Sequence, residues 1–222
     1  VAGQAGTRTR MHWPGVWHEA ARHGGEMLLL PRLARREQPL PLLVLVDVSG
    51  SMERYTRLLL AFLHAATHGL QGQGGRRDVF AFGTGVTDLT PAFRAADTDQ
   101  MLALAGQAIE DFGGGTRLGE SLTQLRQRHA RRLVGRRTLV LLVSDGLDTG
   151  EPELLGHELQ WLRRHCRRLL WLNPLLRFAG YAPLARGASV LHRHADAMLA
   201  VHNLNALEQL AASLAALMRA GR

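Results

Sequence analysis

Three apolar runs of strand length constrain the fold of this chain more than any other feature. They cover residues 42–47, 138–145 and 167–174, and the first two end in aspartate. A strand that is apolar at consecutive positions is buried on both faces, as in a parallel sheet with helices on each side. The segments between the runs show helical periodicity. This alternation predicts an α/β, Rossmann-like fold with a mostly parallel central sheet and helices on both faces.

Shorter segments complete the predicted sheet. Residues 77–83 and 86–91 read as two short strands separated by Gly-Thr-Gly, which is typical of a hairpin and makes the second strand an antiparallel edge. Residues 197–204 read as a further short strand. Helices are predicted over residues 53–70, 98–110, 116–133, 151–166 and 205–220.

The first 40 residues differ in composition from the rest of the chain. They are rich in Gly, Arg and His and include most of the proline-marked basic run PRLARREQPLP. We expect residues 1–40 to be an arm or linker, and, because the chain begins with Val1, the end of a longer N-terminal region. Within it, residues 17–30 are expected to form a short helix and a strand-like segment. Residues 41–222 are expected to form one domain.

The cellular compartment is predicted from three features. No apolar stretch is long enough to cross a bilayer, and the N-terminus lacks the pattern of a signal peptide. Cys166 is the single cysteine, so an internal disulfide is excluded and a reducing environment is favoured. We expect a cytoplasmic protein in which Cys166 is a structural thiol.

The net charge of +8 raises the question of an acidic partner. All 27 basic residues are arginines, which pair with carboxylates and phosphates. Nucleic-acid binding is therefore an alternative function. We favour a solvated basic surface, because the arginine doublets are scattered along the sequence and are not interleaved with aromatic residues. The doublets considered are at residues 35–36, 76–77, 131–132, 136–137 and 167–168.

Small polar residues gather in three loops that follow predicted strands or precede predicted helices. The loops are Asp-Val-Ser-Gly-Ser at 47–51, Gly-Gly-Gly-Thr at 113–116 and Ser-Asp-Gly at 144–146. Carboxyl ends of parallel strands share one rim of the sheet, where ligands bind in such folds. Carboxylate and hydroxyl oxygens without His or Cys suit Mg²⁺, with Mn²⁺ or Ca²⁺ as alternatives, rather than zinc.

Each of these residues also has a purely structural interpretation. Asp47, Ser49 or Ser51 alone fits the N-cap of the following helix, and Thr116 is a natural N-cap for its own helix. Asp148 is expected to be a turn or N-cap residue. Three loops with matching oxygen donors at one rim favour the metal site over capping alone.

Two histidine pairs receive structural interpretations. His64 and His68 have the i,i+4 spacing of half a zinc site but lack the glutamate of a zinc-protease motif. His192 and His194 lack a third ligand, and we expect them to lie in a loop.

The three loops together resemble the metal-ion-dependent adhesion site (MIDAS) of von Willebrand factor A (VWA) domains. The resemblance covers roughly residues 40–222. It implies a VWA fold and a metal ion whose open position is filled by an acidic side chain of a partner. The positions that match the motif, and that the resemblance assigns to the metal, are Asp47, Ser49, Ser51, Thr116 and Asp145.

A narrower resemblance rests on GGE…RLARR, LVDVSGSMERY, DFGGGTRLGESL and WLNP. These segments look like the CoxE-like branch of bacterial VWA proteins, which are similar to factors in carbon monoxide dehydrogenase maturation. The resemblance implies a MoxR-type AAA+ ATPase as partner and a metalloenzyme as client, contacted through a partner Asp or Glu.

An enzyme is the alternative class. Asp47 stands where aspartyl-phosphate phosphatases place their nucleophile, so a Mg²⁺-dependent phosphoester hydrolase is the alternative function. Those enzymes need a second acid two residues later, where this chain has Ser49, and generally a lysine, which this chain lacks. Gly-x-Ser-x-Gly and Gly-x-Gly-x-x-Gly motifs are absent from the first loop. We therefore expect a protein that is not an enzyme.

Overall fold

The computed structural model describes residues 10–11, 13–22, 32–33, 40–72, 75–109, 115–178, 180–201 and 212. The chain divides into two units, Val1–Glu37 and Gln38–Arg222. In the smaller unit, β1 (Arg10–Met11) pairs antiparallel with β2 (Arg32–Leu33). The helix α1 (Trp13–Arg22) lies between them in sequence.

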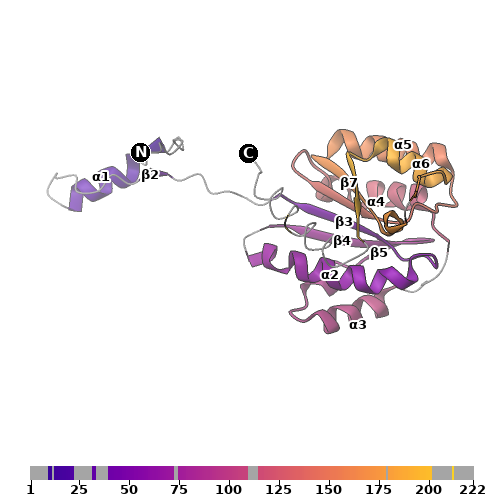
Figure 1. Cartoon of the computed structure of the whole chain (residues 1–222). Coiled ribbons are helices and arrows are strands. Elements are labelled where there is room, and N and C mark those ends of the chain that lie inside the picture. Colours follow the sequence, from indigo (N-terminus) through magenta and orange to yellow (C-terminus); the bar gives the residue numbers. More distant parts are fainter. Residues whose placement is uncertain are drawn as a thin grey trace, which may run out of the picture. The chain divides into compact units, whose positions relative to one another are not determined.

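The larger unit is built around a six-stranded sheet in the order β5-β4-β3-β6-β7-β8 (Figure 1). All neighbouring strands are parallel except the pair β4–β5. The predicted fold class, with one antiparallel edge strand, is confirmed. The strands are β3 (Leu42–Asp47), β4 (Arg77–Phe82), β5 (Val86–Asp88), β6 (Leu139–Val143), β7 (Arg168–Asn173) and β8 (Ala197–Ala200).

Helices cover both faces of this sheet (Figure 1). One face carries α2 (Glu53–Gly72) and α3 (Thr98–Ala108), and the other carries α4 (Leu118–Leu133), α5 (Pro152–His165) and α6 (Arg186–His194). Short 3₁₀ turns lie at Ala92–Arg94 and Pro174–Arg177. Within the described part of the chain, no helix combines the length and apolarity needed to cross a membrane.

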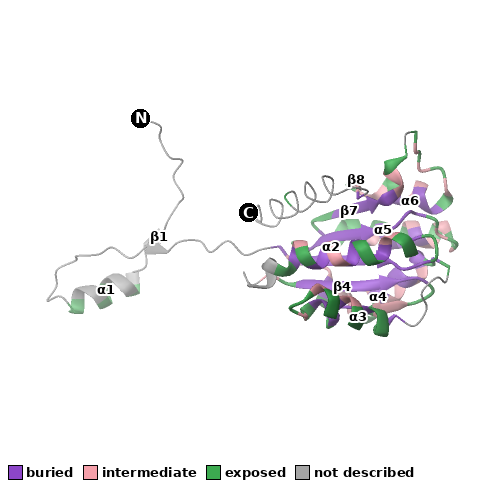
Figure 2. Ribbon diagram, turned by 60° about the horizontal axis from the view of Figure 1, so that its bottom comes forward, coloured by how far each residue is buried: buried purple, intermediate pink, exposed green. Residues whose placement is uncertain are grey.

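Two apolar cores lie on opposite faces of the sheet, and β3 contributes to both. Leu42, Val44 and Val46 belong to the core that includes α2 and α3. Leu43 and Leu45 belong to the core that includes α4 and α5. Because consecutive strand residues point to opposite faces, a strand covered on both sides must be apolar throughout. Figure 2 shows the strands β4 and β7 of this sheet as mostly buried.

The register places all four central parallel strands level with one another. Leu42 pairs with Arg77 and with Leu139, and Leu139 pairs with Arg168. The strands therefore begin at one edge, here called the amino edge, and end at the opposite carboxyl edge. Asp47 ends β3 at the carboxyl edge.

The helix α6 is the main described element that the sequence pattern did not predict. The expected loop around His192 and His194 is wrong, since both lie in the last turn of α6. This helix is short and contains Gly187 close to its start, which weakens any sequence signal. A Cβ at Gly187 would lie 2.6 Å from the Cβ of Asp148, so glycine is needed for this contact. The predicted helix 205–220 and residues 202–204 of the predicted strand 197–204 lie outside the described residues, except for residue 212.

Gly146 lies in the loop after β6, packs against α6 and has no room for a side chain. Its φ is +81°, a conformation that L-residues with a side chain rarely adopt. An added Cβ would lie 2.8 Å from the Cβ of Ala188 and 2.9 Å from its Cα. A side chain at this position would therefore destabilise the fold in two ways, by backbone strain and by overpacking.

We expect Gly146→Ala to lower the free energy of unfolding by about 2 kcal/mol or more. The matched variant Gly106→Ala lies on an exposed part of α3 with no heavy atom within 4 Å of the new Cβ, and should raise it by roughly 0.5–1 kcal/mol. Urea unfolding of both variants tests this. Equal stability of the two would contradict the packing described here.

Candidate metal centre

The carboxylate of Asp47 lies at the centre of a polar cluster at the carboxyl edge. Its side chain is fully buried. Oδ1 accepts a hydrogen bond from the backbone N–H of Ser49 at 2.9 Å, and Oδ2 accepts one from the hydroxyl of Ser144 at 2.7 Å. The Thr116 hydroxyl lies 3.4 Å from Oδ1 and 3.5 Å from Oδ2. Three segments far apart in the sequence therefore meet at one carboxylate.

The first loop presents two serine hydroxyls beside Asp47. The Oγ atoms of Ser49 and Ser51 lie 3.3 Å apart. Ser49 is buried and Ser51 is exposed, so the pair leads from the carboxylate toward solvent. The loop is anchored from α2, where the Thr56 hydroxyl donates to the carbonyl of Asp47 at 3.1 Å.

The second loop holds Thr116 by its backbone. The carbonyl of Thr116 accepts hydrogen bonds from the N–H and the hydroxyl of Thr149, at 2.9 and 2.8 Å. Arg117 N–H donates to the carbonyl of Gly83 at 3.0 Å. The Thr116 hydroxyl is thus held toward Asp47. Gly115 belongs to the described residues, whereas Gly113 and Gly114 lie outside them.

The N-cap of α4 differs from the prediction. Arg117, not Thr116, occupies the N-cap position, and its side chain makes no capping bond. Oδ1 of Asp148 instead accepts a hydrogen bond from the N–H of Leu118 at 2.8 Å. Thr116 is therefore not a cap, and Asp148 caps a helix that lies 30 residues earlier in the chain.

The third loop brings a second buried carboxylate. Asp145 is buried, and its Oδ1 accepts the N–H of Leu147 at 3.0 Å. The preceding Ser144 is held at both backbone groups, since its N–H donates to the carbonyl of Leu172 at 3.1 Å and its carbonyl accepts Trp171 Nε1–H at 2.8 Å. The buried Trp171 thus fixes this loop through its indole N–H.

Burial raises the pKa of Asp47 to about 6. Hydrogen bonds from Ser49 and Ser144 lower that pKa, while the negative charge of Asp145 raises it further. Keeping this carboxylate ionised costs free energy, because its desolvated charge is stabilised by neutral hydrogen-bond donors and not by a cation. A divalent cation between the two carboxylates would remove this cost.

The donor set fits a hard divalent cation. Among the described residues, no group of three or more His, Cys, Asp or Glu side chains could hold a metal ion. A bound ion would therefore use the two carboxylates with serine and threonine hydroxyls and water. Oxygen donors of this kind, few in number, are typical of Mg²⁺, which prefers ligands at about 2.1 Å and keeps several waters.

Of the five positions predicted for the metal, four form one connected cluster: Asp47, Ser49, Ser51 and Thr116. Asp145 is buried beside them, in the third loop, and acts on Asp47 through its charge. Sequence reasoning did not assign Ser144, the residue with the shortest hydrogen bond to Asp47. The position of Ser144 in the Ser-Asp-Gly segment, directly after the apolar strand, was the sequence feature that could have identified it.

The remaining candidates are structural. Both ring nitrogens of His64 lie 3.0 Å from hydrogen-bond partners, Nδ1 from the Thr98 hydroxyl and Nε2 from the Ala95 carbonyl. Cys166 is buried, and burial raises its pKa to about 12, which makes it a poor nucleophile.

Comparison with known families gives one match, to the family described as "VWA domain containing CoxE-like protein", over residues 5–207. The match begins before residue 41 and so includes most of the predicted arm. No curated protein matches the chain.

Several solved structures share the fold. A von Willebrand factor type A structure from Catenulispora acidiphila has a TM-score of 0.55 and 18% identity, and the match covers 85% of this chain and 44% of that one. Proximal thread matrix protein 1 from the mussel byssus, solved with a zinc-occupied MIDAS motif, has a TM-score of 0.54 and 17% identity, covering 82% and 48%. The chain thus spans less than half the length of these structures.

We expect MgCl₂ to raise the melting temperature of the wild-type chain by several degrees, as follows when the free ion exceeds its Kd about 100-fold. Thr116→Val, which removes the hydroxyl facing Asp47, should lose at least about half of this shift. Thr123→Val is the matched control, because that hydroxyl donates to the carbonyl of Gly119 within α4. A full shift in Thr116→Val would contradict the site.

The affinity for Mg²⁺ should fall as the pH drops below about 6, by roughly tenfold per unit, because the ion must then displace a proton from Asp47. Because the pKa of Asp47 is raised in the folded state, protonation of Asp47 stabilises the metal-free fold. This contribution to the free energy of unfolding is fully present below the ordinary pKa near 3.8 and is lost as the pH rises through about 6. Calorimetric Mg²⁺ titrations across this range test the first effect. An affinity independent of pH would exclude Asp47 as a ligand.

Proposed function

This chain belongs to the family of VWA domains containing CoxE-like protein, and we propose that it is a protein-interaction module whose binding depends on a divalent metal ion. The observation that carries the proposal is the buried Asp47 carboxylate with hydroxyls of Thr116 and Ser144 directed to it from two other loops. Such a site offers oxygen ligands to a cation and little else.

We assign the metal to Asp47, Ser49, Ser51, Thr116 and Asp145, directly or through water. Mg²⁺ is the proposed ion, with Mn²⁺ or Ca²⁺ as alternatives, because all donors are hard oxygens. The zinc-occupied motif of the mussel protein supports a divalent ion in a site of this kind.

The proposed ligand of the bound ion is a carboxylate of a partner protein. The exposure of Ser51 at the rim leaves the site reachable from solvent. A partner Asp or Glu would complete the coordination sphere and add a charge-assisted contact that is geometrically demanding. Recognition would then depend on where the partner holds that side chain.

Binding without catalysis is favoured by the residues around Asp47. The position two residues after it is Ser49, which cannot act as the second acid of an aspartyl-phosphate phosphatase. The sequence contains no lysine to balance a phosphate. In the described residues, the side chains that contact the Asp47 carboxylate are hydroxyls, which are poor general bases at neutral pH.

The CoxE-like family points to a more specific role. We propose that the chain is an adaptor between a MoxR-type AAA+ ATPase and a client metalloenzyme during the enzyme's maturation or activation, and that it works in the cytoplasm. We further propose that residues 41–222 form the interaction domain and that residues 1–40 are an arm that leads into it.

A pull-down of a MoxR-type ATPase from the same genome tests this role. The immobilised wild-type chain should retain the ATPase in Mg²⁺ and release it in EDTA. Asp47→Asn should reduce retention at least about tenfold, equivalent to ~1.4 kcal/mol. Asp99→Asn is the control, because Asp99 is exposed in the first turn of α3, away from the site.

The outcomes separate the two parts of the proposal. Retention of the ATPase in EDTA would contradict the metal-mediated contact. Failure to retain it in Mg²⁺, with the Mg²⁺-dependent melting shift intact, would exclude this partner while keeping the metal centre.

A further inference from the structure

Arginine doublets that are separate in the sequence come together at the amino edge of the sheet. Two doublets lie at the starts of β4 and β7, two lie in the last turns of α4 and α5, and one lies in the turn before β6. We call this surface the arginine edge. Its members are Arg76, Arg77, Arg131, Arg132, Arg136, Arg137, Arg163, Arg164, Arg167 and Arg168.

The topology explains this convergence. Each helix that returns from the carboxyl edge ends where the next parallel strand begins. Arg77 and Arg168 occupy the same row of the sheet, because both are level with the first residues of β3 and β6. The doublets are thus scattered along the sequence but gathered in space for these segments, while the doublet at 35–36 lies outside the described residues.

A hollow of about 320 Å³ opens within the arginine edge. Arg76, Arg77, Arg94 and Arg132 line it, together with the single carboxylate of Asp78. The residues that line this hollow include four arginines and one carboxylate, and this excess of positive charge gives it a positive potential, which attracts anions.

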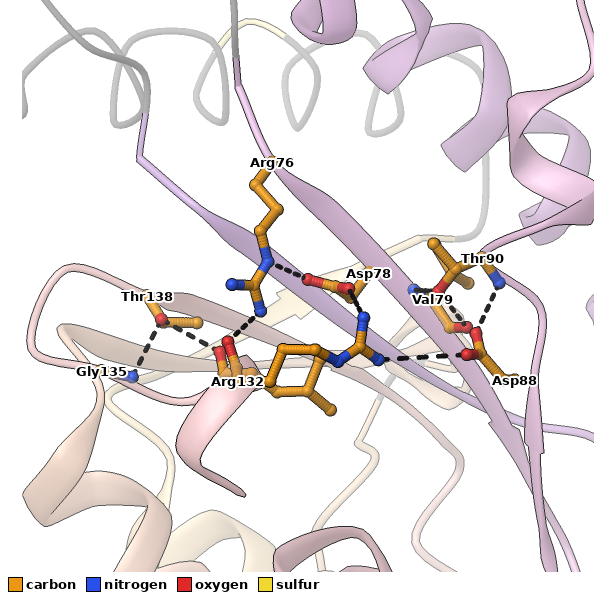
Figure 3. A network of polar contacts seen from close by, with 9 residues as sticks. Arg76, Asp78, Val79, Asp88, Thr90, Arg132, Gly135 and Thr138 are labelled. Carbon is orange, nitrogen blue, oxygen red and sulfur yellow. Dashed lines mark hydrogen bonds and ion pairs between the residues drawn. The ribbon is translucent and has the colours of Figure 1, made fainter. Parts of the chain in front are cut away.

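Asp78 holds two of these arginines in fixed positions (Figure 3). Its Oδ2 accepts Arg76 Nε–H at 2.6 Å, and its Oδ1 accepts Arg132 Nη1–H at 3.2 Å. Arg76 Nη2 also donates to the carbonyl of Arg132, and Arg132 Nη2 lies 4.0 Å from Asp88 Oδ2. These contacts occupy only some of the five N–H groups of each guanidinium. The remaining donors are held in place without a large loss of side-chain entropy on binding.

Arg77 is a buried cation at the wall of the hollow. It is 4% exposed, donates to the Thr67 hydroxyl at 2.5 Å and to the carbonyl of Phe93, and stacks over the Phe93 ring at 5.1 Å. Its Nε has no hydrogen-bond partner among the described residues. Neutral acceptors only partly offset the burial of this charge, so a nearby anion would stabilise it.

We propose that the arginine edge is a second docking surface, which binds a segment of a partner protein rich in Asp and Glu. Asp or Glu carboxylates would enter the hollow and accept paired N–H groups from the arginines, the geometry in which arginine binds carboxylates most strongly. This binding requires no metal ion and does not rest on the function proposed for Asp47.

The carboxylates within the edge favour a protein over a nucleic acid. Asp78, Asp88 and Asp196 form ion pairs with Arg76, Arg132 and Arg163. They interrupt the basic surface and would repel a continuous phosphate backbone, whereas a peptide places its carboxylates singly. Nucleic-acid grooves also offer aromatic rings for stacking. The Phe93 ring beside Arg77 is buried, and the ring of Trp161 is already stacked on His165, with the centroids 4.6 Å apart.

The two surfaces lie at opposite edges of the sheet. Strand β3 has six residues, so the edges are roughly 20 Å apart at about 3.3 Å per residue. Both surfaces are therefore accessible at once.

Fluorescence anisotropy with a labelled polyglutamate peptide and the full 222-residue chain tests the proposal, with EDTA present to silence the metal centre. The wild-type chain should bind at low NaCl and lose affinity steeply at high NaCl. Arg94→Gln combined with Arg136→Gln should weaken binding at least about tenfold. Both side chains are exposed, so the variant should keep its fold, which circular dichroism checks.

The control variant combines Arg54→Gln with Arg57→Gln. Both arginines are exposed on α2, away from the amino edge, and the two substitutions remove the same net charge as the first variant. It should change the affinity less than about twofold. The proposal is overturned by an equal loss in both variants, by no loss in the first, or by no binding in the wild type. Tighter binding of an RNA of equal length than of the peptide would assign the surface to nucleic acid instead.

Discussion

The cost of burying the Asp47 carboxylate is the constraint on which the rest of the larger unit depends. A carboxylate without solvent must receive hydrogen bonds, and here they come from the first, second and third loops. The second loop leads into α4 and the third follows β6, so the same contacts set where these elements begin and end. Thr116 and Ser144 are therefore structural residues as well as candidate ligands. The geometry of the site and the geometry of the fold cannot be varied independently.

The parallel strands place different kinds of side chain at the two edges of the sheet. The helices that lead into parallel strands, α2, α4, α5 and α6, run opposite to the strands. Their N-termini therefore gather at the carboxyl edge and their C-termini at the amino edge, whereas α3, which follows the antiparallel β5, runs the other way. The positive end of the helix dipole favours carboxylates at the first edge, and the negative end favours arginines at the second. The last turns of α4 and α5 carry Arg131, Arg132, Arg163 and Arg164, as this rule requires. One topological choice thus separates a hard-oxygen site from a guanidinium surface.

The sequence predicted most of the sheet and most residues of the polar cluster around Asp47, and each omission has a physical cause. A strand buried on both faces is apolar at consecutive positions, so the bounds of the central strands were predicted to within one or two residues. The positions of Asp47 and Thr116 followed from their places at strand and helix ends. Three features depend on which segments become neighbours in space: the bond of Ser144 to Asp47, the capping of α4 by Asp148, and the gathering of the arginines. Local patterns cannot carry such information before the strand order is known.

The anchoring of α4 at both ends makes this helix a strut between the two edges. Its first turn is tied to the third loop through Asp148, and Arg132 in its last turn is tied to Asp78 on β4. The sixteen residues of α4 span about 24 Å, comparable with the roughly 20 Å between the two edges. A helix resists compression far better than a loop does. The two ends of α4 are therefore held at a fixed separation, and neither end can shift without breaking the bond that holds it.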